Sequence, residues 1–102
     1  MPHFIYRITP ARPDMPNNPS DAEKASIGRH FAHLKSAVHE GRALMAGRTA
    51  DADTFGIVIF EAEDEFAAQN FAAADPGVSE GVFRLVEVRP FSVALWNQEF
   101  QP

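Results

Sequence analysis

The chain has no cysteine, which excludes disulfide bonds, thiolate nucleophiles and cysteine-ligated metal centres. Basic residues are few: 9 Lys and Arg stand against 14 Asp and Glu, so the formal net charge is −5 and the pI is near 5.2. Nucleic acids and anionic membranes bind clustered positive charge, so we expect neither as a partner. The sequence lacks an apolar run of the ~18 residues that a membrane span needs, and it begins without a signal-peptide pattern. We therefore expect a soluble, cytoplasmic protein.

The sequence also lacks a glycine-rich phosphate loop, because its glycines stand alone. Its 102 residues suit one compact domain that buries roughly two-thirds of its unfolded surface. We therefore treat residues 1–102 as a single domain.

Local patterns predict an alternation of strands and helices. We expect strands at 4–8, 43–46, 55–60 and 82–95, helices at 20–40 and 64–74, a proline-rich loop at 9–19 and a C-terminal tail at 96–102. Pro90 places the last strand at a sheet edge or a bulge. The order strand, helix, strand, strand, helix, strand is typical of a ferredoxin-like α+β fold. That fold has a four-stranded antiparallel sheet with two helices on one face.

The first helix begins with a capping box, in which Ser20 and Glu23 satisfy each other's backbone N–H groups. Its apolar residues recur at helical spacing and predict a stripe that faces the sheet: Ile27, Phe31, Leu34 and Val38.

The strand at 55–60 is apolar on both faces, because Ile57 and Ile59 point one way while Val58 and Phe60 point the other. Helices cover only one face of a two-layer domain. A second copy of the same sheet is the simplest cover for the other face, so we expect a homodimer.

His30 lies at the edge of the predicted stripe, where a half-buried imidazole could act as a general acid or base. A core-edge histidine bonded to a backbone carbonyl is the alternative, and spacing alone favours it. His33 follows one turn later and further toward solvent. The two could hold a metal together, but no third ligand completes a recognised spacing, so we expect no metal.

Asp75 precedes Pro76 and is a natural cap for a short helical turn. A second reading is that its carboxylate orients the imidazole of His30 or shares a substrate proton with it.

Six short patterns, taken together in order and spacing, resemble the YCII-related (YciI-like) domain family. They are His30-x-x-x-Leu34, Glu40-Gly41-Arg42, Ala46-Gly47, Phe71-x-x-x-Asp75-Pro76, Gly81-Val82-Phe83 and Val88-Arg89-Pro90-Phe91. The resemblance implies a small dimeric α+β barrel protein, similar to muconolactone isomerase and related enzymes. The family's helix histidine and its aspartate before proline fall on His30 and Asp75.

The chain departs from the family pattern at two positions. Gly77 stands where many members have an aromatic residue, and we expect it to leave the pocket wall more open. Arg48 stands where members usually have proline, which could bring a cation near the site.

Taken with the resemblance, these residues predict a cofactor-free lyase or isomerase that acts on a small organic acid, lactone or similar ring compound. His30 and Asp75 form its catalytic pair, in a cleft between the first helix, the Asp75 turn and the sheet. Our candidates for substrate binding are Tyr6, Arg7, His33 and Arg48. The alternative is a non-catalytic module that binds a small ligand or a partner protein.

Overall fold

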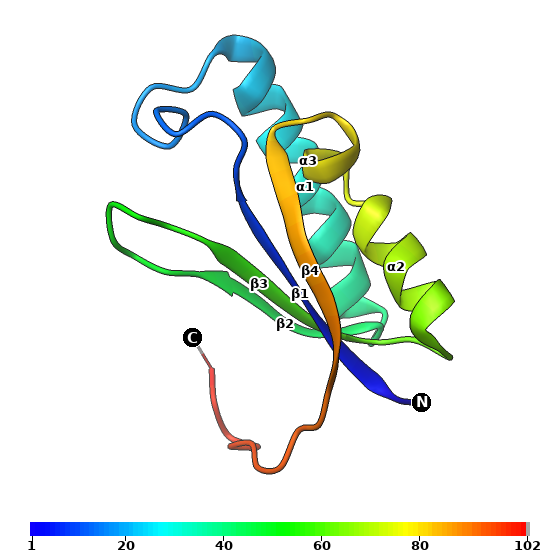
Figure 1. The fold of residues 1–102 in the computed structure, drawn as a ribbon. Coiled ribbons are helices and arrows are strands. Elements are labelled where there is room, and N and C mark those ends of the chain that lie inside the picture. Colours follow the sequence, from blue (N-terminus) through cyan, green and yellow to red (C-terminus); the bar gives the residue numbers. More distant parts are fainter. Residues whose placement is uncertain (102) are drawn as a thin grey trace.

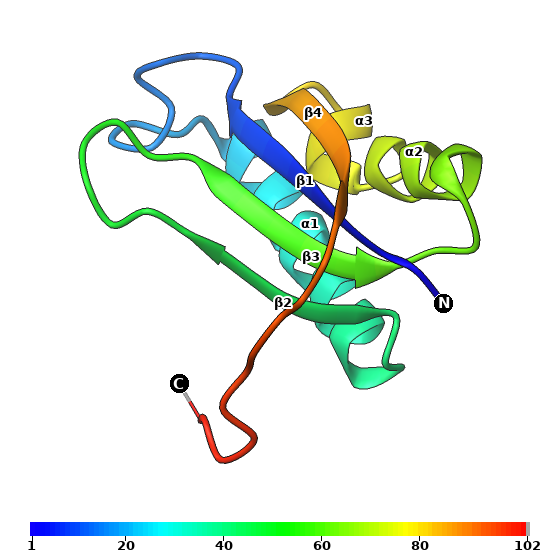
Figure 2. The same ribbon diagram turned by 60° about the horizontal axis from the view of Figure 1, so that its bottom comes forward.

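A four-stranded antiparallel sheet carries three helices on one of its faces in the computed structural model (Figures 1 and 2), which describes residues 1–101. The elements in chain order are β1 (His3–Pro10), α1 (Asp21–His39), β2 (Ala43–Arg48), β3 (Gly56–Glu61), α2 (Glu65–Ala73), α3 (Pro76–Ser79) and β4 (Phe83–Phe91). The strand order is β2-β3-β1-β4. The predicted ferredoxin-like fold is therefore confirmed, with α3 as one additional short turn.

Helix caps form where the sequence predicts them. The Oγ of Ser20 accepts from Glu23 N (3.1 Å), and the Glu23 carboxylate accepts from Ser20 N (2.8 Å). The same carboxylate accepts from the Arg12 guanidinium at 2.6 Å, which fastens the proline-rich loop to the start of α1. Gly41 follows the helix with φ +81°, a conformation that residues with a Cβ rarely adopt.

Three predicted boundaries are wrong by a few residues. β1 continues through Thr9 and Pro10, so the loop begins at residue 11. β2 extends to Arg48, and β4 ends at Phe91 instead of at residue 95. The last strand is an edge strand, as Pro90 predicts, because an edge leaves the missing N–H of proline without consequence.

The predicted apolar stripe of α1 is displaced by one residue. Phe31 and Val38 are 67% and 44% exposed. The residues that face the sheet and the other helices have the same spacing, each one position earlier than expected: Ser26, His30, His33 and Ala37, with Leu34 beside them. Small Ser26 and Ala37 let the helix approach the sheet closely, and the two histidines face inward because Asp75 and Phe71 lie there.

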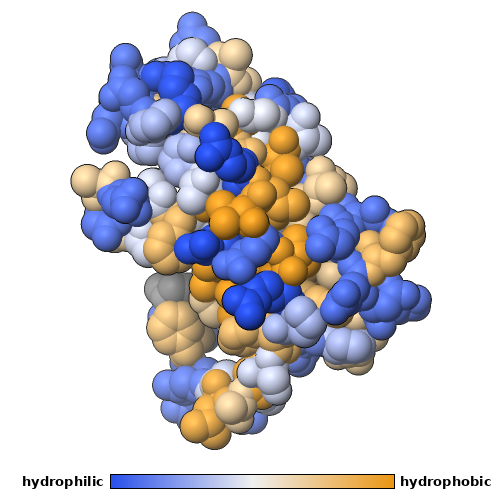
Figure 3. All heavy atoms as spheres, in the orientation of Figure 1, coloured by the Kyte–Doolittle hydropathy of each residue, from blue (hydrophilic) through white to orange (hydrophobic). Residues whose placement is uncertain are grey.

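Alternation along the central strands separates the two faces of the sheet. Tyr6 pairs with Val58, and both side chains are buried under the helices. Ile5 and Arg7, on the same strand, point to the opposite face, where they lie against Ile59 and Ile57 of β3. We call this the open face, because no helix covers it. Figure 3 shows apolar side chains gathered over the sheet, with charged side chains among them.

Candidate functional site

Asp75 joins α2 to α3 and is the cap of the shorter helix. Its Oδ1 accepts from Gly77 N at 2.9 Å, and Pro76 occupies the first helical position, where its missing N–H has no cost. The predicted cap is therefore present. Unlike an ordinary cap, however, the side chain is 0% exposed. A carboxylate buried this completely requires further hydrogen bonds.

Two side chains from distant segments supply those bonds. His30 Nδ1 of α1 lies 2.6 Å from Asp75 Oδ1, and the Tyr6 hydroxyl of β1 donates to Asp75 Oδ2 at 2.6 Å. Tyr6 is 0% exposed, and it contacts Phe60 and Phe71 edge-on. The fold thus brings together residues from its first strand, first helix and third helix around one carboxylate.

The hydrogen bonds around Asp75 keep it ionised. Burial acts to raise the pKa of Asp75, but the bonds from His30 and Tyr6 outweigh it and hold that pKa below its ordinary value. Burial raises the pKa of the Tyr6 phenol, and the adjacent Asp75 charge raises it further. At neutral pH the pair is therefore a neutral phenol that donates to a carboxylate.

An ionised carboxylate can only accept hydrogen bonds, and this fixes the tautomer of His30. When the ring is neutral, Nδ1 must carry its proton, and the lone pair lies on Nε2. Nε2 has no partner within residues 1–101, and it is not among the buried nitrogens. The side chain as a whole is 15% exposed. His30 therefore presents Nε2 to solvent, while Asp75 holds the ring through Nδ1.

Gly77 allows the turn to pack against the site. A Cβ at Gly77 would lie 2.4 Å from Cδ2 of Phe83 and 3.2 Å from Nδ1 of His30. The Phe83 ring, whose centroid lies 4.9 Å from that of His30, fills the space beside the turn. The expectation that Gly77 opens the pocket wall is therefore wrong, because an aromatic ring from β4 closes it.

An ion pair on the surface connects the two helices that carry the site. The Arg29 guanidinium donates to both oxygens of Glu80, with a shortest distance of 2.6 Å. Arg29 precedes His30 on α1, and Glu80 ends α3. The bidentate geometry limits sliding of one helix past the other. The two residues are 51 positions apart, so no local pattern predicts this pairing.

Three of the four predicted substrate-binding residues do not lie where a ligand at His30 would touch them. Tyr6 is near the site, but it is fully buried and contacts Asp75 instead of solvent. Arg7 points to the open face, where it lies 5.4 Å above the Phe55 ring and 3.2 Å from the Glu87 carboxylate. Arg48 is at the end of β2, on the sheet edge opposite β4. Alternation along β1 and the strand order explain the last two placements.

His33, the fourth of these residues, is half-buried one turn after His30. Its ring lies 5.7 Å from the Phe71 ring, and its Nε2 is buried without a hydrogen-bond partner. It is further from solvent than the spacing predicted. Across residues 1–101, no group of three or more His, Asp or Glu side chains is arranged to hold a metal.

Two hollows of the subunit lie away from His30. One of about 490 Å³ lies on the open face, between Arg7, Thr54, Phe55 and Arg84. A second, of about 450 Å³, lies between residues 1–3 and 90–93. Neither includes His30 or Asp75, and a cleft beside the partly exposed imidazole stays a prediction.

Comparison with known proteins identifies the family of the chain. Residues 5–92 match the model of the YCII-related domain. The chain belongs to this family. It is 41% identical over 71 residues to Protein YciI of Escherichia coli and of Shigella flexneri, which covers 61% of this chain and 72% of each relative. The YCII-related resemblance is thereby confirmed.

A solved structure shares the fold of this YCII-related chain. It is 5-chloro-2-hydroxyhydroquinone dehydrochlorinase of Burkholderia phenoliruptrix, in complex with 2,5-dihydroxybenzoquinone. The TM-score is 0.58 with 24% sequence identity, over 90% of this chain and 94% of that one.

As for membranes, none of the helices within residues 1–101 is both long and apolar enough to span one.

Proposed function

We propose that this YCII-related protein is a cofactor-free lyase or isomerase whose general base is Nε2 of His30. The 2.6 Å contact between His30 Nδ1 and Asp75 Oδ1 is the observation that carries the proposal. It fixes the tautomer, leaves the lone pair facing outward, and places a negative charge behind the ring. This is the arrangement by which a carboxylate prepares a histidine to take a proton.

The proposed step is a proton transfer that needs no external electron acceptor. Nε2 removes a proton from a carbon or hydroxyl of the substrate, and the released electron pair forms a new double bond. In a lyase, that pair expels a leaving group such as a halide, which departs with its own electrons. In an isomerase, the same nitrogen returns the proton to another carbon. In both cases the substrate supplies all of the electrons, so no cofactor takes part.

Asp75 and Tyr6 serve as positioning residues in this proposal. Both are 0% exposed, so neither touches substrate. Asp75 holds the imidazole and offsets the positive charge that the ring acquires when it takes the proton. Tyr6 and Gly77 N–H hold Asp75 in turn, and they keep the carboxylate ionised although it is buried.

The substrate class that we propose is a small organic acid or an oxygenated ring compound. The structural relative is named for removing chloride from a hydroxylated aromatic ring, and its structure contains a dihydroxybenzoquinone. A hydroxyl on such a ring ionises at about pH 10, far more readily than an aliphatic alcohol, so an imidazole can act on it as a general base in the transition state. Beside His30, the Phe83 ring offers a flat apolar surface on which such a ring could stack.

We also propose that the protein is a homodimer in which the open faces of two sheets meet. The apolar residues Ile5 and Ile57 of that face support the proposal, because they stay partly exposed in the single subunit and no helix covers them. Arg7 and Glu87 lie on the same face, so a two-fold axis could set opposite charges against each other. A cytoplasmic location stays a prediction.

One observation favours a ligand-binding module as a second candidate. The hollow of about 490 Å³ on the open face includes two arginines, Arg7 and Arg84, and does not include His30. A small anion bound there would need no general base. In that case the His30–Asp75 contact would only hold α1 against α3.

Replacing His30 with Gln separates the two candidates. The wild type and H30Q are incubated with hydroxylated and chlorinated ring compounds, lactones and small organic acids, and turnover is followed by absorbance and halide release. We expect H30Q to lose turnover of any active compound by at least ~100-fold while it remains folded. His39→Gln, at the exposed end of the same helix, is the matched control and should stay active. Full turnover by H30Q would overturn the proposal.

A further inference from the structure

The segment that follows β4, residues 92–101, is unusually apolar for a part of the chain that leaves the folded body. Three large side chains on it are almost free of contacts: Leu95 is 92% exposed, Trp96 70% and Phe100 69%. Asn97 organises a turn within the segment, accepting from Phe100 N at 3.2 Å and from Glu99 N at 3.0 Å. No hydrogen bond found within residues 1–101 joins the segment to the rest of the subunit.

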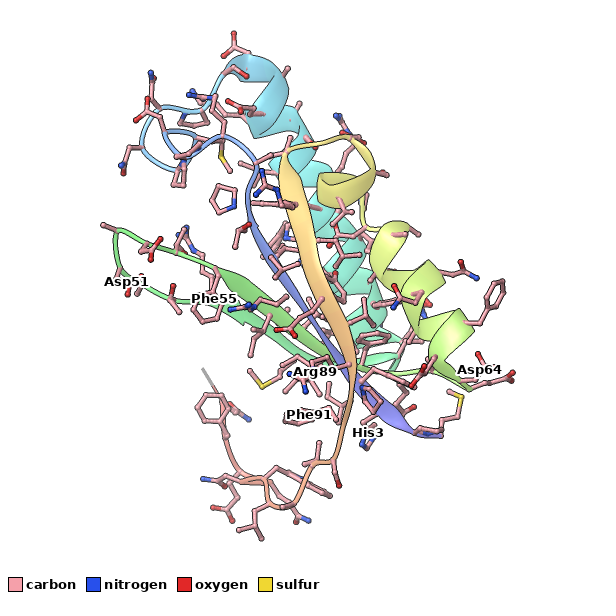
Figure 4. All side chains as sticks on the ribbon, in the orientation of Figure 1. His3, Asp51, Phe55, Asp64, Arg89 and Phe91 are labelled. Atoms are coloured by element: carbon pink, nitrogen blue, oxygen red, sulfur yellow. The ribbon has the colours of Figure 1, made fainter. Side chains whose placement is uncertain are left out.

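The segment runs on the side of the sheet that the helices leave uncovered. In Figures 1 and 2 it departs from the end of β4 and turns back beneath the sheet, with all three helices on the other side. Arg89 and Phe91 project from the end of β4 on the side toward which the segment runs (Figure 4). The segment that carries the exposed apolar side chains therefore lies on the same side of the sheet as the open face.

We infer that residues 92–101 of each chain pack onto a second copy of the protein and fasten the dimer from its rim. This inference rests on the proposed homodimer and adds to it the segment that closes the interface. The segment does not cover its own sheet, since Leu95 and Trp96 remain in solvent within the subunit. A two-fold pairing of open faces would bring the sheet of one copy next to the segment of the other.

The chemistry of the segment and of the open face matches a partner of the same sequence. Large apolar side chains such as Trp and Phe contribute most of the binding energy at interfaces when they are buried. The open face supplies apolar surface for them, with the charged side chains of Arg7, Glu87 and Arg89 among it. A face that carries both signs of charge can complement a second copy of itself under a two-fold axis, whereas a surface that binds an acidic or a basic partner carries one sign.

Trp96 is the only tryptophan of the chain, so its fluorescence reports on this segment alone. The experiment records the Trp96 emission maximum and the molar mass by sedimentation over one dilution series of the full chain. We expect blue-shifted emission at concentrations where the dimer forms. The emission should move to that of a water-exposed indole with the same midpoint as the loss of mass.

Variants complete the test. Leu95→Ser and Phe100→Ser, made together, keep the reporter, and we expect them to raise the dimer dissociation constant on the order of tenfold or more. The matched control is Phe66→Ser on α2, a residue that is 77% exposed on the helix-bearing side and should leave the constant unchanged. A stable dimer with water-exposed Trp96 at every concentration would overturn this inference and leave the homodimer standing. A monomer at all concentrations would overturn both.

Discussion

Nδ1 of His30 and Oδ1 of Asp75 lie 2.6 Å apart, although 45 positions separate the two residues in the sequence. The contact is possible because α3 begins at Asp75 and packs beside the middle of α1. Asp75 is buried, and only the imidazole reaches solvent. The reactive nitrogen and the group that controls it are thus on opposite sides of one ring.

The first prediction concerns Asp75→Asn. The amide keeps the size of the carboxylate but removes its charge, and its NH₂ group can donate to Nδ1 and reverse the tautomer. We expect kcat to fall on the order of 10²–10⁴-fold, as when the orienting carboxylate of a histidine base is lost, with a much smaller change in KM. Steady-state kinetics on the substrate found by the H30Q screen would check this. A kcat for D75N that falls no further than that of the H39Q control would contradict this prediction.

The second prediction concerns Tyr6→Phe. The change removes the donor to Asp75 Oδ2 and leaves that oxygen buried without a partner, at a cost of about 1–3 kcal/mol in the free energy of unfolding. Loss of the same bond raises the pKa of Asp75. Urea unfolding at several pH values measures both effects.

The sign of the pH dependence follows from the lowered pKa of Asp75. The folded protein holds this carboxyl ionised to lower pH than the unfolded chain does. Its contribution to stability is therefore present above the unfolded pKa of about 4 and is lost as pH falls through the folded value. In Y6F the loss should be smaller and should be complete at a higher pH than in the wild type, because the folded pKa of Asp75 moves closer to the unfolded one. Parallel curves for the two proteins would contradict this coupling.

The third prediction uses the single tyrosine of the chain as its own reporter. Burial and the Asp75 charge raise the pKa of Tyr6, so the folded protein keeps its phenol protonated when an exposed tyrosine would ionise. Stability should fall as pH rises above the unfolded value of about 10. Tyrosinate absorbance should appear only with the loss of helical circular dichroism. Ionisation of Tyr6 in protein that is still folded at about pH 10 would show that the phenol is accessible.

The fourth prediction concerns the close approach at Gly77. A Cβ there would lie 2.4 Å from the Phe83 ring, so Gly77→Ala should destabilise the fold by about 1–3 kcal/mol through overpacking. Phe83→Leu in the same chain removes ring atoms, and we expect it to recover part of the loss. Gly28→Ala is the control, because a Cβ at that exposed helical position meets nothing within 4 Å. An unchanged free energy of unfolding in G77A would contradict this prediction and would mean that the turn can shift away from Phe83.

Local features were predictable from the sequence, and their combination in space was not. The caps at Ser20 and Asp75 depend on residues a few positions away, and both form as the sequence indicates. The strand at 55–60 is also predictable from the sequence, because its residues are apolar on both faces. The residues themselves leave the contact between His30 and Asp75 as one of two readings, and the family resemblance makes it the preferred one. Spacing along the chain contains no information on two groups 45 positions apart.

The errors have physical reasons of their own. The large apolar residues of α1 predict a buried face one residue away from the observed one, because side-chain size does not mark the buried side of this helix. That face in fact holds two small residues and two histidines. Tyr6 and Arg7 were predicted together as substrate contacts, yet adjacent residues of a strand point to opposite faces. Neither the ring of Phe83 beside Gly77 nor the ion pair from Arg29 to Glu80 leaves a local signal.

The central claim is that Asp75 holds the proton of the neutral His30 ring on Nδ1 and leaves the lone pair on Nε2. Nitrogen-15 NMR of the imidazole groups, with His30 assigned through H30Q, measures this directly at a pH where the ring is neutral. The account predicts a protonated Nδ1 and an unprotonated Nε2 in the wild type, with that preference lost in D75N. A wild-type ring that carries its proton on Nε2 would contradict it.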